Sequence, residues 1–263
     1  MKLKWMTSLV GVSLLAACSM PAQLQAQDAA KPGNIALVET QTVKPGMMKQ
    51  YEAGRKQLAA WRKQQNDPKP LDVWMTVSGE HAGSYVISRL GYHWADFDKP
   101  AIPESTEMDK FMEVMGGAVE SVVPRYYAYL EKDSNSVSPS ASQGPPKMIE
   151  VITFEVRYGH TADFRSGIRR IAEAAQKTKW PEDYGWYALA NGGRTGTYAL
   201  VLPRANWADF EDKPGEKPFE EMLKDAFGQD EADSILKRLD TSIESESTEL
   251  LEYRSDLSYM PGK

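Results

Sequence analysis

An internal repeat constrains this chain more than any other feature of its sequence. The segment His-Trp-Ala-Asp-Phe at 93–97 returns as Asn-Trp-Ala-Asp-Phe at 206–210, 113 positions later. At the same offset, about fourteen residues are identical between 38–97 and 151–210, whereas average composition gives roughly four identities over this length. Asp-Lys-Pro follows both copies, at 98–100 and, after one inserted residue, at 212–214. The chain is therefore a tandem duplication, and its fold must be built from two similar halves.

The segment before the first repeat carries targeting signals. Lys2 and Lys4 precede an apolar run at 5–17, which is the pattern of a secretory signal peptide and is too short for a membrane-spanning helix. Leu-Ala-Ala-Cys at 15–18 resembles the lipobox of bacterial lipoproteins, in which Cys18 is lipidated and becomes the new N-terminus. Leu-Gln-Ala at 24–26 is the alternative, an ordinary cleavage site. The lipobox is favoured because the only cysteine falls where the motif requires one, which predicts a signal peptide at 1–17 and a flexible tether at 18–33.

Cysteine content and charge limit the compartment and the partners. The single cysteine leaves no disulfide, and each half, at about 110 residues, is long enough to bury a core without one. The net charge of -6 becomes -8 when Lys2 and Lys4 are lost, which disfavours nucleic acid as a partner. We expect an exported, periplasmic protein that is attached to the envelope only through the lipid on Cys18. An oligomer is not required.

Residue patterns predict the same order of elements in both halves. In the first half, strands are expected at 35–43, 71–78, 84–92 and 125–130, and helices at 47–65 and along an apolar stripe at 108–122. A linker rich in Ser and Pro occupies 134–146. In the second half, strands are expected at 148–156, 184–190, 197–202 and 249–253. Helices are expected after Phe219, at 230–243, and along the apolar positions Phe164, Ile168, Ile171 and Ala175.

Each half thus has the order β-α-β-β-α-β, the ferredoxin-like arrangement, in which two helices cover one face of an antiparallel sheet. The other face of such a sheet is too apolar to be left in water. We therefore predict an α+β fold in which two ferredoxin-like repeats, at 34–133 and 147–258, pack their antiparallel sheets face to face.

Four short segments carry a family resemblance. They are Val-Lys-Pro-Gly at 43–46, Val-Arg-Tyr-Gly-His at 156–160, and the two copies of Trp-Ala-Asp-Phe. With these segments the chain resembles the dimeric α+β barrel superfamily, which includes antibiotic-biosynthesis-monooxygenase-like and NIPSNAP-like domains. The resemblance covers both repeats and implies that one chain supplies both halves of the barrel. The fold supports monooxygenases, haem enzymes, isomerases and proteins without known chemistry, so it does not specify a reaction.

A candidate ligand site follows from the residues expected near the centre of each sheet. By strand parity, Glu39 and Glu150 share one face of the sheets, and Arg89 shares a face with Tyr85. If this face lines the space between the sheets, it forms an aromatic pocket with a few polar groups, which is typical of a small-molecule site. The candidate residues are Glu39, Trp74, Tyr85, Arg89, Glu150, Tyr187 and Tyr198. The alternative is an ion pair, such as Glu39–Arg89, that closes the interface between the repeats without a ligand.

No residue pattern predicts a catalytic group, a metal site or a cofactor. His81, His93 and His160 lack the spacing of metal ligands, so we expect them to be solvated or to cap backbone. An axial haem ligand could come only from His93 or His160. Trp94 and Trp207 occur in both halves and are expected to anchor their turns in the core. Glycine-rich nucleotide motifs and the Gly-x-Ser-x-Gly motif are absent from the sequence.

These observations favour a non-catalytic envelope protein that binds a small hydrophobic or aromatic molecule between its repeats. The alternative is a cofactor-free, monooxygenase-like enzyme that holds an aromatic substrate in the same cavity, with Glu39 or Glu150 as the base. A large cavity between the sheets favours either function over a filled interface. A buried carboxyl group with a strongly raised pKa favours the enzyme.

The lipid anchor is directly testable. Labelling of the expressed protein with radioactive palmitate is expected, and Cys18→Ala should abolish the label and release the protein from membranes, because the thiol is the site of lipid attachment. An unlabelled wild-type protein whose mature chain begins at Gln27 would show that the ordinary cleavage site is used instead.

Overall fold

The structure, a computed structural model, describes residues 32–136, 144–211 and 217–262. The signal peptide, Cys18, nearly all of the tether, the centre of the linker and the second Asp-Lys-Pro segment at 212–214 lie outside the described residues. The predictions made for those segments therefore stay predictions.

The first repeat has the predicted order of elements. These are β1 (Ile35–Val43), α1 (Met48–Gln64), β2 (Asp72–Ser78), β3 (Tyr85–Tyr92), the short 3₁₀ helix η1 (Trp94–Asp96), α2 (Glu104–Met115), β4 (Val119–Tyr129) and the 3₁₀ helix η2 (Glu131–Asp133). The helix expected at 108–122 is shorter than predicted. It ends before Gly116 and Gly117, which lower helix stability, and the valines that follow belong to β4 instead.

The second repeat adds one helix to the same order. Its elements are β5 (Met148–Val156), α4 (Thr161–Thr178), β6 (Gly185–Asn191), β7 (Thr197–Arg204), the 3₁₀ helix η3 (Trp207–Phe210), α5 (Phe219–Phe227), α6 (Gln229–Ser242) and β8 (Ile243–Tyr253). The last strand begins six residues earlier than position 249, where it was predicted. Residues 244–248 are polar and exposed on both faces, so they lack the apolar alternation by which a strand is recognised.

All eight strands form one closed antiparallel barrel, in the order β1-β3-β2-β8-β5-β7-β6-β4. The last strand of each repeat pairs with the second strand of the other: β4 pairs with β6, and β8 pairs with β2. The predicted α+β fold is thus confirmed, with two ferredoxin-like sheets that face each other across one interior. Because the sheets are also joined at both edges, no strand of the barrel has an open edge.

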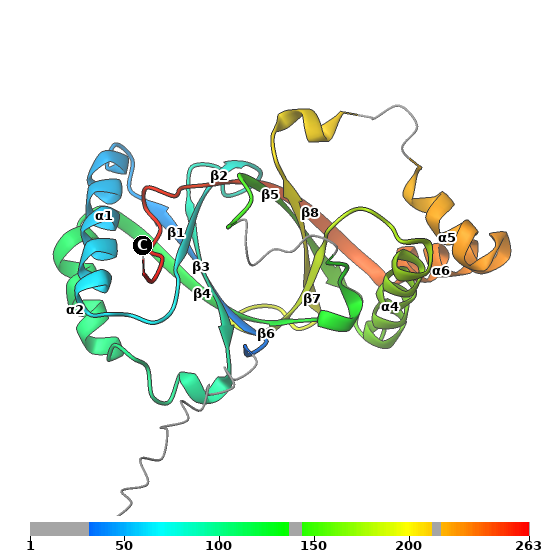
Figure 1. The fold of residues 1–263 in the computed structure, drawn as a ribbon, viewed down its shortest axis with the longest axis horizontal. Helices are drawn as coiled ribbons and strands as arrows, with labels where there is room; N and C mark the ends of the chain where they lie inside the picture. The colour runs from blue at the N-terminus through cyan, green and yellow to red at the C-terminus, as the bar shows by residue number, and fades with distance from the viewer. Residues whose placement is uncertain (1–31, 137–143, 212–216, 263) are drawn as a thin grey trace, which may run out of the picture. The chain divides into compact units, whose positions relative to one another are not determined.

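The helices cover the outside of the barrel, with α1 and α2 over the first repeat and α4, α5 and α6 over the second, on the opposite side (Figure 1). The hydrophobic cores lie between these helices and the outer face of the strands. In the first repeat the core includes Tyr51, Leu58 and Tyr85, and in the second it includes Phe164 and Tyr198. No helix within the described ranges is long and apolar enough to cross a membrane.

Each repeat also sends its C-terminal extension onto the other repeat. After β8, Leu257 and Tyr259 enter the core of the first repeat, and the Tyr259 hydroxyl donates a 2.7 Å hydrogen bond to the backbone oxygen of Asp67. After β4, Asn135 pairs with Tyr184 of the second repeat through backbone hydrogen bonds, and buried Asp133 binds two arginines of α4. The two repeats therefore complete each other's cores.

The expectation that Trp94 and Trp207 are core residues is wrong, since their exposed fractions are 51% and 65%. The 3₁₀ helices that carry them, η1 and η3, follow β3 and β7 beyond the helix-covered core. The repeated motif stabilises these turns through its aspartates, whose carboxylates accept backbone hydrogen bonds from His93 (3.0 Å) and Ala205 (2.7 Å). The motif therefore recurs because the turn geometry recurs, and it does not require a buried tryptophan.

Candidate functional site

A cavity of about 1360 Å³ occupies the interior of the barrel. Every strand contributes alternate residues to its wall, including Val38, Trp74, Val151 and Val201. Loops border both ends: the hairpin loops at 80–81 and 193–194 lie at one end, and residues 32–34 and 144–147 lie at the other. We call this space the barrel cavity. It is larger than the usual range for a drug-sized ligand.

One wall of the barrel cavity is made of tyrosines. Tyr127 and Tyr129 project inward from β4, and the β4–β6 register places Tyr187 directly opposite Tyr129, with ring centroids 5.2 Å apart. Burial raises the pKa of Tyr187 to about 12 and also raises that of Tyr127. In the described part of the chain, none of these three hydroxyls makes a hydrogen bond with another side chain or with the backbone. All three are thus available to water or to a ligand.

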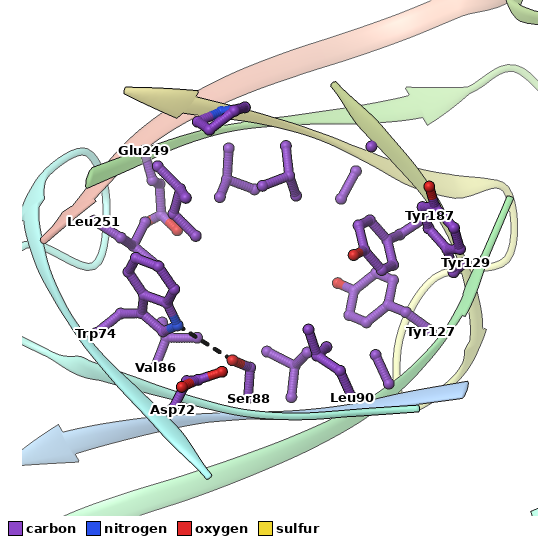
Figure 2. Close-up of a pocket in the computed structure, with 18 of the residues that line it drawn as sticks. Asp72, Trp74, Val86, Ser88, Leu90, Tyr127, Tyr129, Tyr187, Glu249 and Leu251 are labelled. Carbon is purple, nitrogen blue, oxygen red and sulfur yellow. Dashed lines mark hydrogen bonds between the residues drawn. The ribbon is translucent and has the colours of Figure 1, made fainter. Parts of the chain in front are cut away.

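The facing wall combines an indole with a carboxyl group (Figure 2). The Trp74 Nε1–H donates to Ser88 Oγ at 3.2 Å, and the Tyr253 hydroxyl donates to Asp72 Oδ1 at 3.2 Å. Burial raises the pKa of Asp72, and the hydrogen bond from Tyr253 opposes that rise only partly. Asp72 is therefore a carboxyl group that faces the barrel cavity and holds its proton more readily than an ordinary aspartate.

Sequence reasoning missed Asp72, although two signals mark it. Aspartate is disfavoured within strands, so an aspartate in β2 is a candidate for a functional role. The repeat offset also pairs Asp72 with Gly185, so this carboxyl group is present in one half only.

Charged side chains gather at the hairpin-loop end of the barrel cavity. The Glu249 carboxylate is bound by His81, through the ring Nδ1 at 2.7 Å and the backbone N–H at 3.0 Å. The Arg194 guanidinium binds the carboxylates of Glu155 and Glu244. Arg125, on β4, also lines this end.

The seven residues proposed from the sequence divide between the two faces of the barrel. Trp74 and Tyr187 line the barrel cavity. Five others do not: Glu39, Tyr85, Arg89, Glu150 and Tyr198 lie on the outer, helix-covered face. Strand parity grouped these five correctly but did not show which face points inward. Trp74 and Tyr85 were also placed on one face, whereas the β2–β3 register pairs Trp74 with Val86 and Met75 with Tyr85.

The contacts of the outward residues explain why they belong to the helix interface. The Tyr85 hydroxyl donates to Glu52 of α1 at 2.7 Å, and the Tyr198 ring packs on Phe164 of α4 at 4.7 Å. Glu150 accepts a hydrogen bond from Arg204 at 2.7 Å. Glu39 and Glu150 do not line the barrel cavity, so neither is placed to act as a base on a molecule within it.

The predicted Glu39–Arg89 ion pair exists, but it does not close the interface between the repeats. Arg89 Nη2 lies 3.4 Å from Glu39 Oε1 and 2.7 Å from Glu107 Oε1 of α2. Arg62 of α1 binds the same Glu107 carboxylate and that of Asp67. These mostly buried charges join the outer face of the sheet to α1 and α2, all within the first repeat.

The histidines do not assemble a metal centre. His93 forms a capping box with Asp96, and the His160 ring lies 3.3 Å from the Asp163 carboxylate on an exposed turn of α4. His81 is the histidine that borders the barrel cavity. Among the described residues, no group of three or more His, Cys, Asp or Glu side chains could hold a metal ion.

Comparisons with known proteins identify the fold. No protein-family model and no curated protein matches the sequence. Among solved structures, a candidate monooxygenase from Lactobacillus acidophilus NCFM is 10% identical, covers 87% of this chain and 96% of its own, and gives a TM-score of 0.52. An anthrone oxidase-like protein is 10% identical, with coverages of 89% and 95% and a TM-score of 0.51. A candidate chlorite dismutase is 8% identical, with coverages of 84% and 96% and a TM-score of 0.50. The chain thus has the fold of the dimeric α+β barrel proteins over most of its length.

From the Arg89 ion pairs we predict how stability changes when Arg89 is replaced by the residue at the equivalent position of the second repeat. Arg89→Leu, which introduces the equivalent residue Leu202, should destabilise the protein by about 3 kcal/mol, because it leaves the Glu39 carboxylate buried without its cation. Adding Glu39→Ile, which copies Ile152, should restore part of the loss. Thermal and urea unfolding measure both effects.

Arg194→Leu is the matched control, since that arginine forms exposed ion pairs, which contribute little to stability. Equal melting temperatures for Arg89→Leu and Arg194→Leu would contradict a structural role for the Arg89 pairs.

Proposed function

We propose that this protein binds a small, flat, mainly aromatic molecule inside the barrel cavity. The observation that carries the proposal is the cavity itself, with Trp74 on one side and three tyrosines with unused hydroxyls on the other (Figure 2). Large apolar cavities with a few convergent polar groups are the usual form of small-molecule sites. Aromatic rings prefer offset or edge-on contact with other rings, so these side chains suit a ring system better than an alkyl chain.

Many of the side chains that point into the barrel are small, which supports the proposal that the cavity is kept open for a ligand. An eight-stranded barrel is just wide enough to be filled by its own side chains, and protein interiors are normally close-packed. Here Ala36, Val38, Val151, Ala199 and Val201 point inward. Gly185 also faces this space, where a Cβ would lie 3.3 Å from the Tyr187 ring. Small residues on the inner face therefore leave the volume that larger ones would fill.

A fluorescent probe tests this proposal. N-phenylnaphthylamine, a neutral aromatic dye that brightens in apolar sites, should bind the full-length protein at about one site with micromolar affinity. Val201→Trp should weaken binding, because Val201 lines the cavity opposite Gly185 and an indole there takes up part of the space beside Tyr187. Trp94→Ala, which removes an exposed ring outside the cavity, should leave binding unchanged. Equal binding by wild type and Val201→Trp would contradict a dye site between Trp74 and the tyrosine wall.

A second function is favoured by one specific residue. Asp72 faces the barrel cavity, and burial raises its pKa above the ordinary aspartate value, which is a common property of carboxyl groups that act as general bases. Two of the structural neighbours are named as a candidate monooxygenase and an anthrone oxidase-like protein. The second candidate is therefore a cofactor-free oxygenase, in which Asp72 takes a proton from an acidic C–H group of an aromatic ketone and the resulting anion gives electrons to O₂. Overall, CH₂ and O₂ become C=O and H₂O.

Asp72→Asn separates catalysis from binding. With anthrone as the probe substrate, oxygen consumption above the uncatalysed rate should increase as pH rises through the raised pKa of Asp72, and the variant should lose it. An unchanged rate in Asp72→Asn would exclude Asp72 as the base.

The stability of the same variant follows from linkage. A carboxyl group whose pKa is higher in the folded state stabilises the fold below its unfolded pKa, and this contribution is lost as pH rises through the folded pKa. Asp72→Asn should therefore melt at a higher temperature than wild type at pH 7, with a gain that shrinks on acidification.

We propose that this binding takes place in the bacterial envelope, after export and lipid attachment at Cys18. The support is the sequence of the N-terminal segment, and the palmitate experiment tests it independently of ligand binding.

A further inference from the structure

Two charged residues of opposite sign occupy equivalent positions in the barrel cavity. Arg125 on β4 lies opposite Val38 of β1, and Glu249 on β8 lies opposite Val151 of β5. Val38 and Val151 are counterparts in the repeat, so the duplication places Arg125 and Glu249 at matching points of the barrel wall. Both line the cavity, at the end formed by the hairpin loops.

The two charges differ in their partners. Glu249 has partners within the protein, because its carboxylate accepts a hydrogen bond from the His81 backbone and lies 2.7 Å from the His81 ring. In the part of the chain that the structure describes, the Arg125 guanidinium has neither an ion pair nor a hydrogen bond. Glu80 borders the same end but forms no ion pair with Arg125, and Glu155 and Glu244 are bound to Arg194. Arg125 is thus a cation in the cavity wall whose charge the described protein does not balance.

The surroundings of Arg125 keep its guanidinium accessible from the cavity. The β6–β7 loop passes beside it through Gly192 and Gly193, where a Cβ on Gly192 would lie 3.0 Å from the Arg125 Cα. Gly192 has a φ of +93°, which disfavours a larger residue there. Tyr127, two residues along β4 and on the same face, adds a hydroxyl with no partner among the described residues. The loop therefore approaches closely without covering the charge.

We infer that the ligand of the barrel cavity is an aromatic acid, whose anionic group binds Arg125 and Tyr127 while its ring system extends toward Trp74, Tyr129 and Tyr187. This inference rests on the proposed binding function and specifies the ligand class. The planar guanidinium offers paired N–H donors that match a carboxylate or sulfonate, and the adjacent phenol adds a third donor. Glu249 lies at the same end of the barrel, where His81 binds its carboxylate through the ring and the backbone N–H.

A pair of dyes tests the charge directly. Anilinonaphthalene sulfonate and N-phenylnaphthylamine share one aromatic skeleton and differ by the sulfonate group. Wild-type protein should bind the sulfonate dye at least about tenfold more tightly than the neutral dye, because one charge-assisted hydrogen bond contributes about that factor in affinity. Arg125→Gln should remove that preference and leave the affinity for the neutral dye unchanged. Arg194→Gln, at the same end of the barrel, is the matched control and should keep the preference.

The outcomes distinguish this inference from the proposed function. Equal affinity of wild type for both dyes, or a preference that survives Arg125→Gln, would overturn the inference while cavity binding stands. Absence of neutral-dye binding to wild type would refute the proposed function itself. Equal affinity of wild type and Val201→Trp for the sulfonate dye would place its ring system away from Tyr187 and also count against the inference.

Two further measurements do not depend on the Arg125→Gln variant. Naphthoate should displace the bound sulfonate dye from wild type at concentrations at which naphthol does not, and displacement by both alike would contradict an anion site. Arg125→Lys should retain most of the preference, because it keeps the positive charge, and circular dichroism confirms that each variant is folded.

Discussion

The pairing of strands between the repeats is the interaction on which the rest of this structure depends. Neither sheet is complete alone, because β4 needs β6 as its neighbour and β8 needs β2. The same registers place Tyr129 opposite Tyr187 and Trp74 opposite Tyr253, so they build the two aromatic walls of the cavity. The extensions after β4 and β8 then enter the opposite core. One set of backbone hydrogen bonds thus closes the barrel, aligns the site and couples the two cores.

Fusion of the repeats allows the two halves of the site to differ. A barrel made from two identical chains would repeat every inward residue, so a cation on one side would face the same cation on the other. In this chain, Trp74 corresponds to Tyr187, Asp72 to Gly185 and Arg125 to Glu249. The cavity consequently has different groups in its two halves, and a ligand bound as we propose would have a preferred orientation within it.

The order of helices and strands could be predicted from the sequence because the duplication gives two copies of each pattern, so an assignment in one repeat can be checked against the other. The side of the sheet that faces the cavity could not be predicted, because both faces carry large side chains: Tyr85 and Tyr198 pack under helices, while Trp74 and Tyr187 line the interior. The alternation of side chains along a strand shows which residues share a face, but it does not show which of the two faces points into the barrel. The exposure of Trp94 and Trp207 could not be predicted either, because a tryptophan that recurs in both repeats is equally consistent with a recurring turn and with a recurring core position.

The separation of the two faces has a consequence for how this protein can change. Its cores lie on the outer, helix-covered side, where Tyr51, Phe164 and Ile168 are almost completely buried. The inner face carries mainly small side chains and the groups proposed to bind ligand. Asp72 and Arg125 are only partly buried, so substitutions there remove less packing than substitutions in these cores. Inward residues such as Arg125 and Asp72 can therefore vary with the ligand at little cost in stability, whereas Arg89, on the outer side, cannot.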